Sequence, residues 1–540
     1  RQSPRTVDYD IQVRLGDEPR MLEAVEEVVW RNQTRDTVKD LCLHLYLNAF
    51  RNNRSTFMRE SGRSRRGRQM SRDGWGWIRL DSLMLEDGTE LIANLSPEER
   101  QSLFESPDDS NPDDRTVLRL PLPRPVRPGG TLRFAASFSA RLPSPPFART
   151  GEKDRFHMVA QWFPKVAVYE EGRGWNCHQF HANSEFFADY GSYDVAITVP
   201  ADYVEQRAGR TIILGGATGR QVGDGSPSVD GSEWTFRFHA EDVHDFAWVV
   251  DPDFRVLRYH FDGSGADRAE RRRMAEVFGV EDEELDLRDV DVTVLLQPEH
   301  AGQGPRHKDA VENALTYFGL WYGPYPYDTL TVVDPPHGGG GAGGMEYPTL
   351  ITCGTSLWPH PNRYSPEGVT VHEFGHQFWY GLVGTNEFEH AWLDEGFNSY
   401  STTKVLEIAY EDRGTPAVST WSIHGRRFDG HMLASFPAAG APSDPIGWLT
   451  FQRLPWGWWS GGVGGALRSV RVLRDDPLLA VARDLPMVSA VAGGQIPTML
   501  AQRNRYLGRA DFDPMTRNAW DYIDRQSYSV NSYPRPAVML

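Results

Sequence analysis

The first half of the chain alternates short apolar or β-branched runs with turn residues, and this pattern constrains the fold more than any other feature. Up to about Pro252, the residues Gly, Pro, Asn and Asp repeatedly separate these runs. Short strands bounded by such turn signals are typical of antiparallel sheets. We therefore expect a β-rich domain whose strands include residues 9–15, 24–30, 117–120, 132–138, 193–199 and 234–238.

Helical patterns join the strands beyond Asp253. Helices are predicted at residues 267–277 and about 305–322, and strands at residues 290–296 and 330–334. This mixture favours an α+β domain after the β-rich one. In a chain of 540 residues we expect two domains, at residues 1–253 and 254–540.

A glycine tract, Gly338 to Gly344, contains a G-x-G-x-x-G match that follows a predicted strand. A dinucleotide-binding loop must open a helix whose N-terminus receives the pyrophosphate, whereas residues 345–352 are predicted to form another strand. We therefore reject a dinucleotide site and interpret the tract as a mobile connection beside the functional site.

The overall composition excludes several classes of protein. Hydrophobic residues make up 39% of the chain and 17 residues are tryptophan, so a disordered chain is excluded. A formal net charge of -17 argues against nucleic acid as a partner. No uncharged apolar run reaches the roughly 18 residues of a membrane-spanning helix, so we expect no transmembrane segment.

The cysteine content and the chain ends do not determine the cellular compartment of the protein. Cys42, Cys177 and Cys353 are too few to imply a disulfide framework, and their odd number leaves at least one thiol unpaired within the chain. The chain begins at Arg1, without methionine. A removed signal peptide, and with it an exported or periplasmic location, is compatible with the sequence and is not required by it.

The segment TVHEFGHQFW, residues 370–379, contains the pattern most closely tied to chemistry. On an α-helix His372 and His376 are four residues apart and share one face, with about 5 to 6 Å between their β-carbons. Two imidazoles so placed suit Zn²⁺, which accepts nitrogen and carboxylate ligands and keeps one position for water in catalytic sites. Glu373, next to the first histidine, is placed to take a proton from that water.

A third ligand is expected from the segment EHAWLDEGFNS, residues 389–399, which has a helical pattern. Glu395 in this segment completes a set of two histidines and one glutamate that would hold one zinc ion per chain. The alternative is a surface acid. The neighbouring residues are mostly apolar or small, a setting in which an unpaired charge would be costly.

These motifs together resemble the gluzincin zinc aminopeptidases, which include membrane alanyl aminopeptidase and leukotriene hydrolase. HEFGH, the glutamate of DEGF and the upstream GGMEYP, residues 343–348, carry the resemblance, and GGMEYP is typical of a bacterial-type branch. It implies a multidomain fold in which an antiparallel β-rich, saddle-like N-terminal domain precedes an α+β thermolysin-like zinc peptidase domain. It also implies an insertion at about 416–514 and a catalytic domain truncated near Leu540.

The resemblance assigns substrate contacts to the strand after the glycine tract. Glu346 corresponds to the glutamate that binds the α-amine of the substrate, through a charge-assisted hydrogen bond. Gly343, Gly344 and Met345 precede it and are expected to line the bound peptide. Tyr347 departs from the family pattern, which has asparagine at that position.

Two further residues are assigned by resemblance at longer range. Tyr533, in SYPRPA, corresponds to the tyrosine that steadies the oxyanion, and Tyr528 is its rival. Gln161, in AQWFPK, is expected to assist amine recognition, with an ordinary buried glutamine as the alternative.

Three other histidines, His178, His181 and His244, lack a ligand constellation and are expected to be structural. The implied function is a zinc-dependent aminopeptidase that hydrolyses the N-terminal bond of peptides with a free N-terminus, using a metal-activated water. Two alternatives remain open. One is a zinc hydrolase of the same fold that acts on a non-peptide, epoxide-type substrate. The other is a catalytically inactive scaffold.

Overall fold

The described part of the chain forms two compact units. The computed structural model describes residues 3–354 (except 17, 19, 63, 66, 67, 208 and 209), 365–410, 415–416, 422–423, 426–427, 446–449, 470–473, 495–496, 498–507 and 513–540. The first unit comprises Arg1–Pro359, Ser365–Asn398 and Thr516–Asp521; the second comprises His360–Tyr364, Ser399–Met515 and Tyr522–Leu540. Most of the predicted insertion at 416–514 lies outside the described residues. The predicted boundary near Asp253 falls inside the first unit and stays a prediction.

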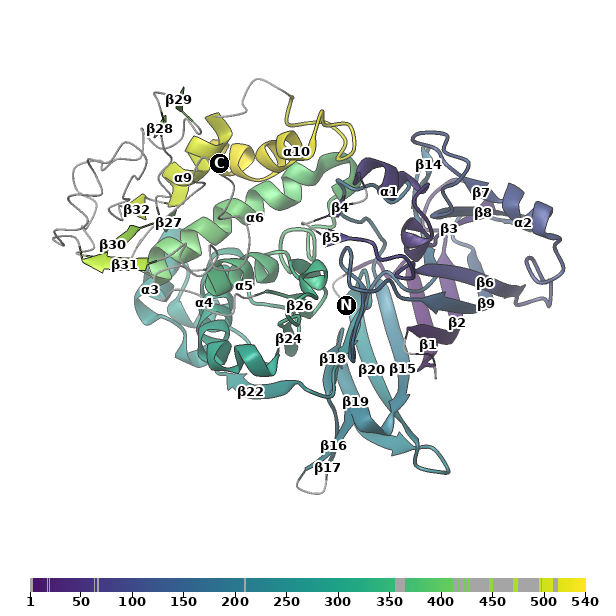
Figure 1. Ribbon diagram of the computed structural model, residues 1–540, viewed down its shortest axis with the longest axis horizontal. Helices are drawn as coiled ribbons and strands as arrows, with labels where there is room; N and C mark the ends of the chain where they lie inside the picture. Colours follow the sequence, from purple (N-terminus) through teal and green to yellow (C-terminus); the bar gives the residue numbers. More distant parts are fainter. Residues whose placement is uncertain are drawn as a thin grey trace. The chain divides into compact units, whose positions relative to one another are not determined.

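A seven-stranded sheet dominates the N-terminal part of the first unit (Figure 1). Its order is β19-β20-β15-β1-β2-β9-β6. The bounds are β1 Val7–Leu15, β2 Met21–Arg31, β6 Trp77–Leu85, β9 Thr131–Arg141, β15 Gly191–Pro200, β19 Arg220–Pro227 and β20 Glu233–Val243. Buried and exposed residues alternate along β2, as expected for a sheet with one face on the core. Five of the predicted strands therefore lie in this sheet.

The sheet departs from the predicted antiparallel arrangement at one pair of strands. Strands β1 and β15 are parallel, with Tyr9 opposite Tyr193. The other five pairings are antiparallel. Parallel neighbours need a long connection, which the chain between Leu15 and Gly191 supplies. The local pattern of each strand does not encode that direction.

Two four-stranded sheets and several two-stranded ones accompany the seven-stranded sheet in the β-rich part. One four-stranded sheet has the order β12-β3-β8-β7 and the other β10-β11-β21-β18. Their bounds are β3 Val38–His44, β7 Phe104–Glu105, β8 Val117–Val126, β10 Gly151–Lys153, β11 Phe156–Val159, β12 Lys165–Val166, β18 Gly215–Ala217 and β21 Trp248–Val250. The short helices include η1 Tyr46–Phe50, α1 Thr56–Glu60 and α2 Pro97–Ser102. Cys42 and Cys177 form a disulfide, and Cys353 is a buried free thiol.

A five-stranded sheet of order β22-β23-β24-β26-β25 supports the second half of the first unit. Its bounds are β22 Arg255–Phe261, β23 Val290–Leu296, β24 Thr329–Val333, β25 Met345–Tyr347 and β26 Leu350–Thr352. Strands β23, β24 and β26 are parallel, and β25 is an antiparallel edge strand. The strands at 345–352 agree with the rejection of a dinucleotide loop.

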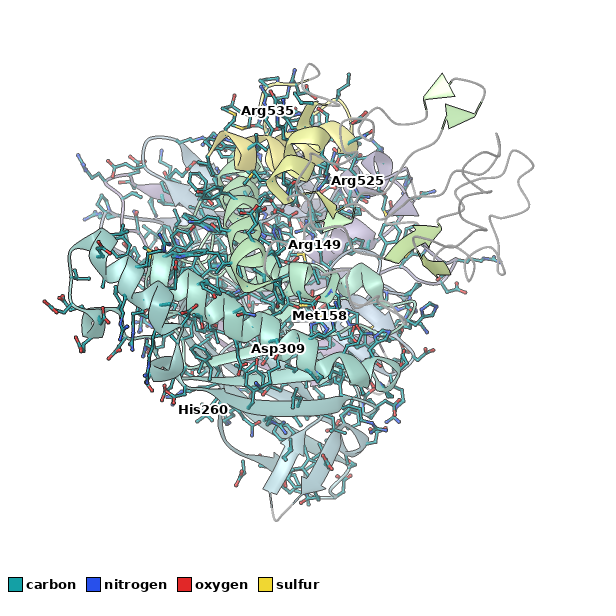
Figure 2. The ribbon with its side chains drawn as sticks, turned by 90° about the vertical axis from the view of Figure 1, so that its left-hand side faces the viewer. Arg149, Met158, His260, Asp309, Arg525 and Arg535 are labelled. Atoms are coloured by element: carbon teal, nitrogen blue, oxygen red, sulfur yellow. A yellow bond between two sulfur atoms is a disulfide. The ribbon has the colours of Figure 1, made fainter. Side chains whose placement is uncertain are left out.

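Helices accompany this sheet, with α3 at Arg268–Phe278, α4 at Gly304–Tyr322, α5 at Ser365–Gly375 and α6 at Glu387–Ala409. Figure 2 shows Asp309 on α4 and His260 on β22. Helix α4 packs on α5, where the rings of Phe318 and Phe374 lie 5.8 Å apart. The second unit also contains α9 Thr498–Leu507, α10 Arg525–Ser532 and α11 Pro534–Met539. Within the described ranges, no helix is both long and apolar enough to cross a membrane.

Candidate functional site

Helix α5 presents the first histidine of the motif and then ends one residue before the second. The helix was predicted to carry both, but it ends at Gly375, and His376 lies in the turn that follows. The backbone N–H of His376 still donates to the carbonyl of His372, at 3.3 Å. The i,i+4 relation therefore persists, and the two imidazole centroids are 4.7 Å apart.

Three potential ligand atoms converge from these two histidines and Glu395. The two Nε2 atoms are 3.2 Å apart, and the Glu395 carboxylate lies 3.1 Å from Nε2 of His372 and 3.4 Å from that of His376. Two donors that bind one tetrahedral zinc ion at about 2.0 to 2.1 Å are about 3.3 to 3.4 Å from each other. The donor set therefore fits zinc in both chemistry and spacing.

Glu395 reaches this point because α6 approaches α5 closely. The amide Nδ2 of Asn398 donates to the backbone carbonyl of His372, at 2.7 Å. A β-carbon added to Gly375 would lie 1.9 Å from Oδ1 of Asn398 and 2.6 Å from the ring of Phe318. The glycine within HEFGH is thus required by the approach of the second helix. Glu395 is only 4% exposed, which excludes the surface-acid alternative.

Two buried carboxyl groups behind His376 were not identified from the sequence. Nδ1 of His376 lies 2.6 Å from Asp394, so its N–H donates there and Nε2 is left for the metal. Asp394 lies beside Glu387, which accepts a hydrogen bond from the backbone N–H of Phe186 at 2.9 Å. Burial raises the pKa of Glu387 well above its ordinary value, and the charge of Asp394 raises it further. The position of Asp394 directly before Glu395 was the available signal.

Glu346 and Glu373 lie beside the ligand set. One carboxylate oxygen of each and a ring nitrogen of His376 all lie within 4.8 Å of one another. Burial raises the pKa of Glu346 well above its ordinary value; the charge of His376 opposes this, while Glu185 and Glu373 add to it. A cationic group bound here would offset the desolvation and the repulsion.

Gln377 fixes the strand that carries Glu346, a role that sequence reasoning missed. Its side-chain amide donates to the carbonyls of Glu346 and Tyr347, at 3.2 and 3.1 Å, and accepts from the N–H of Thr349. Because Gln377 directly follows the second histidine, the metal motif and strand β25 are coupled. Gln377 therefore holds the backbone around Glu346 both at the strand, through Glu346 and Tyr347, and after it, through Thr349.

The residues before Glu346 have different surroundings. Gly343 tolerates no side chain, since an added β-carbon would lie 2.4 Å from the carbonyl oxygen of Cys353. Gly344 has a positive φ of 70° and donates its N–H to the carbonyl of Thr352. The Met345 side chain belongs to the buried core, so its contact with a substrate would be through the backbone.

Gln161 uses both of its polar atoms inside the β-rich part. Its Nε2 donates to Asp245 at 2.5 Å, and its Oε1 accepts from Lys165 at 3.1 Å. Lys165 and Asp245 form a buried ion pair of 2.7 Å. These contacts favour the alternative of an ordinary buried glutamine, and a role in amine recognition stays a prediction.

Tyr533 and Tyr528 lie in the second unit, so they are described separately from the metal ligands. Tyr533 directly follows α10. Its ring centroid is 6.4 Å from that of Tyr528, which lies on α10. The choice between them stays a prediction.

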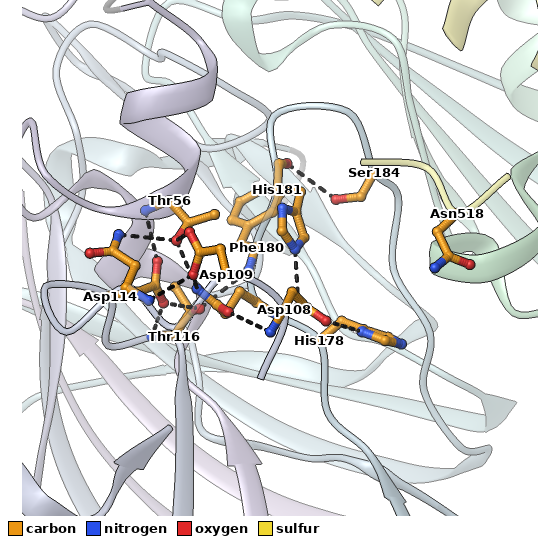
Figure 3. A network of polar contacts seen from close by, with 12 residues as sticks. Thr56, Asp108, Asp109, Asp114, Thr116, His178, Phe180, His181, Ser184 and Asn518 are labelled. Atoms are coloured by element: carbon orange, nitrogen blue, oxygen red, sulfur yellow. Dashed lines mark hydrogen bonds and ion pairs between the residues drawn. The ribbon is translucent and has the colours of Figure 1, made fainter. Parts of the chain in front are cut away.

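The other histidines lie in networks of their own, and none joins a ligand group among the described residues. Figure 3 shows Asp108 between His178 and His181. Asp108 lies 2.8 Å from Nδ1 of His178 and 3.0 Å from Nε2 of His181. The second nitrogens face Glu389 and Glu60, respectively. For His244, burial lowers the pKa to about 3.

Two histidines at the end of one helix and in the turn after it, a glutamate from the next helix and a second glutamate between the histidines define a zinc metallopeptidase of the HExxH class. Comparison with known families supports this definition, because residues 307–427 match the Peptidase family M1 domain. The match contains the ligand set, Glu373 and Glu346. It confirms the resemblance to the gluzincin aminopeptidases: the chain carries an M1 peptidase domain, it is a metallopeptidase, and its cofactor is zinc.

Several solved structures are similar to the chain at low identity. An M1 zinc metallopeptidase from Deinococcus radiodurans is 15% identical, with a TM-score of 0.44, and the match covers 75% of this chain and 72% of that one. Aminopeptidase A of Legionella pneumophila in complex with aspartic acid is 14% identical, with a TM-score of 0.45, over 75% and 38% of the two chains. No curated protein matches the chain.

Proposed function

We propose that the chain is a zinc-dependent aminopeptidase that removes the first residue of peptides with a free N-terminus. His372, His376 and Glu395 would hold the metal. Glu373 would be the general base and Glu346 the amine anchor. The family match supports a zinc aminopeptidase in general, and the geometry around Glu346 supports the particular reaction.

The observation that carries the proposal is the spacing of Glu346 from the reacting groups. Its carboxylate lies within 4.8 Å of Glu373 and of a ring nitrogen of His376. In a peptide, the α-nitrogen is about 2.5 Å from the carbonyl carbon of the same residue. A substrate whose ammonium is bound to Glu346 would therefore have its first carbonyl group beside the general base and the metal. No room remains for a second residue between the anchor and the scissile bond.

Each residue of the site has a separate role in the proposed reaction. When bound, zinc supplies a Lewis acid that polarises the carbonyl and lowers the pKa of a water towards about 7. Glu373 takes a proton from the attacking water and returns it to the leaving amine. Asp394 keeps the Nε2 of His376 directed at the metal, and Glu346 binds the ammonium and orients the substrate. Tyr533 is the proposed hydrogen-bond donor to the developing oxyanion.

The proposal is tested by comparing leucyl-4-nitroanilide with its N-acetylated form, with and without a zinc chelator. We expect turnover only with the free amine, and loss of that turnover on chelation. The variant Glu346→Gln keeps the shape and removes the charge, and should lower kcat/KM for the free amine by about 10- to 100-fold. Hydrolysis of both substrates at similar rates would rule out amine anchoring. A zinc-loaded protein that cleaves neither would favour the epoxide-type or scaffold alternative.

A further inference from the structure

A cavity of about 410 Å³ lies within the N-terminal β-rich part of the first unit. It is lined by β6 and β7, the edge strands of the seven-stranded and one four-stranded sheet, and by residues of α2 and η1. Figure 1 shows α2 beside β6, β7 and β8. Its volume falls in the range of about 300 to 1,000 Å³ that is typical of small-molecule sites. None of the residues that line it belongs to the metal site.

The charged residues that line this cavity are of one sign, and the nearby carboxylate of Asp113, which is paired with Arg54 and Arg59, lies outside the lining. Four arginines line it, with no Asp or Glu among the described lining residues: Arg51, Arg79, Arg100 and Arg115. The chain as a whole carries a formal net charge of -17, so its composition does not account for an acid-free group of arginines. A concave surface with one sign of charge attracts and concentrates ligands of the opposite sign.

Two of the arginines are already satisfied by the protein. Arg79 forms an ion pair with Asp81, at 2.6 Å. Arg100 donates to the backbone carbonyls of Leu80, Ala93 and Leu95. These two side chains therefore have protein partners that account for their positions.

Arg51 and Arg115 differ from this pair. Neither guanidinium makes a hydrogen bond or an ion pair within the part of the chain that the structure describes. Burial lowers the pKa of Arg115, and the charge of Arg51 lowers it further. The pKa of Arg51 is also lowered, by burial and then by Arg54, and the carboxylate of Asp113 opposes the shift of both arginines without reversing it. An anion held between Arg51 and Arg115 would relieve their mutual repulsion.

The rest of the lining is suited to an apolar body with a polar substituent. Trp77, Phe104 and Leu103 contribute apolar surface, and the guanidinium of Arg115 lies over the ring of Phe104 at 5.5 Å. The buried Oε1 of Gln101 has no hydrogen-bond partner among the described residues, so an acceptor is available to a ligand that carries a donor.

We propose that this cavity binds a small organic anion, a carboxylate or phosphate monoester with an aryl or acyl body, whose anionic group lies between Arg51 and Arg115. Guanidinium groups bind carboxylates and phosphates through paired, charge-assisted hydrogen bonds. The apolar body is buried against Trp77 and Phe104. This site is separate from the peptidase reaction and does not depend on it.

The test is isothermal titration of the zinc-loaded full chain with four probes: 3-phenylpropionate, phenyl phosphate, the neutral 3-phenylpropanamide and inorganic phosphate. We expect the two aryl anions to bind at one site with an affinity that falls as salt is added. The amide should bind at least about 10-fold more weakly, because it lacks the charge. Inorganic phosphate, which lacks the apolar body, should also bind more weakly. Equal binding of the amide would overturn the proposal.

Variants distinguish this cavity from the metal site, which also attracts anions. Arg51→Gln and Arg115→Gln should each weaken binding of the aryl anions by about 10-fold or more. Arg79→Gln is the matched control, since that arginine lines the same cavity but is paired with Asp81, and its effect should be smaller. All three should keep the parental peptidase rate, and although the guanidinium of Arg51 is partly buried, the residue keeps enough exposed surface for its variant to fold normally. Binding that survives both Arg51→Gln and Arg115→Gln would assign the anions to another site and overturn the proposal.

Discussion

At the scale of single residues, the proposed mechanism assigns binding of the metal and transfer of the proton to different side chains. His372, His376 and Glu395 direct three donor atoms at one point, at mutual distances of 3.1 to 3.4 Å. Glu373 lies beside that point but outside the ligand set. The two roles should therefore be separable by substitution.

We expect Glu373→Ala to retain one zinc ion and to lose about 10²- to 10⁴-fold in kcat, because a general base contributes about that much. Zinc stoichiometry by metal analysis and kcat on a free-amine substrate measure the two effects. The matched variant His376→Ala should lose the metal itself. A Glu373→Ala enzyme within about tenfold of the parental rate would remove this residue from the mechanism.

At the scale of elements, the site depends on how closely α6 approaches α5. The bond from Asn398 to the carbonyl of His372 and the missing side chain at Gly375 allow Glu395 to reach the two histidines. Gln377 and Asp394 then connect the same turn to strand β25 and to Glu387. Zinc affinity should therefore be sensitive to a single methyl group between the helices.

Gly375→Ala should lower zinc affinity by about tenfold or more and destabilise the fold by about 1 to 3 kcal/mol, as overpacking does. The added β-carbon would lie 1.9 Å from Oδ1 of Asn398, so the Asn398 side chain, which is hydrogen-bonded to the carbonyl of His372, or the helix that carries it must move. Competition with a chelator and thermal unfolding measure these effects. Gly302→Ala is the matched control, because nothing lies within 4 Å of its β-carbon. If both variants bind zinc like the parent, the close approach does not control the site.

At the scale of the whole molecule, segments far apart in sequence meet around His181. Glu60 of α1 and Asp108 face its two nitrogens, Trp520 stacks on the ring at 4.6 Å, and Asp108 also binds His178. An imidazole with a carboxylate at each nitrogen is favoured in its charged form. Burial opposes the charge, but the bonds to Asp108 and Glu60 prevail and raise the pKa of His181 to about 9.

This raised pKa makes stability depend on pH. Because the folded pKa lies above the ordinary value near 6.5, the stabilisation is complete below about pH 6.5 and is lost as the pH rises through about 9. Its upper limit is about 3 kcal/mol. Denaturant unfolding at pH 6.5 and 9 should show a fall in stability that is smaller in His181→Gln. Equal falls in the parent and the variant would show that His181 does not titrate in this range.

The oxyanion donor is also a question for the whole molecule, since Tyr533 and Tyr528 lie in the second unit. If the Tyr533 hydroxyl donates in the transition state, Tyr533→Phe should lower kcat by about 10²-fold with little change in KM. Zinc should remain bound. Tyr528→Phe is the matched control and should be nearly silent. The reverse pattern would assign the role to Tyr528, and two silent variants would exclude both.

The sequence by itself determined the features that depend on near neighbours along the chain. Period-two alternation located five of the seven strands of the largest sheet, and the four-residue spacing of His372 and His376 placed these two side chains together, because both periodicities are properties of the backbone. Only the tertiary structure decided the contacts between segments that are distant in sequence. The parallel pairing of β1 with β15, the hydrogen bond from the backbone of Phe186 to Glu387, and the unpaired arginines of the β-rich cavity join segments whose separation leaves no local pattern. Such contacts are selected by packing and by the cost of burying unpaired charge, and both act only after the segments have met.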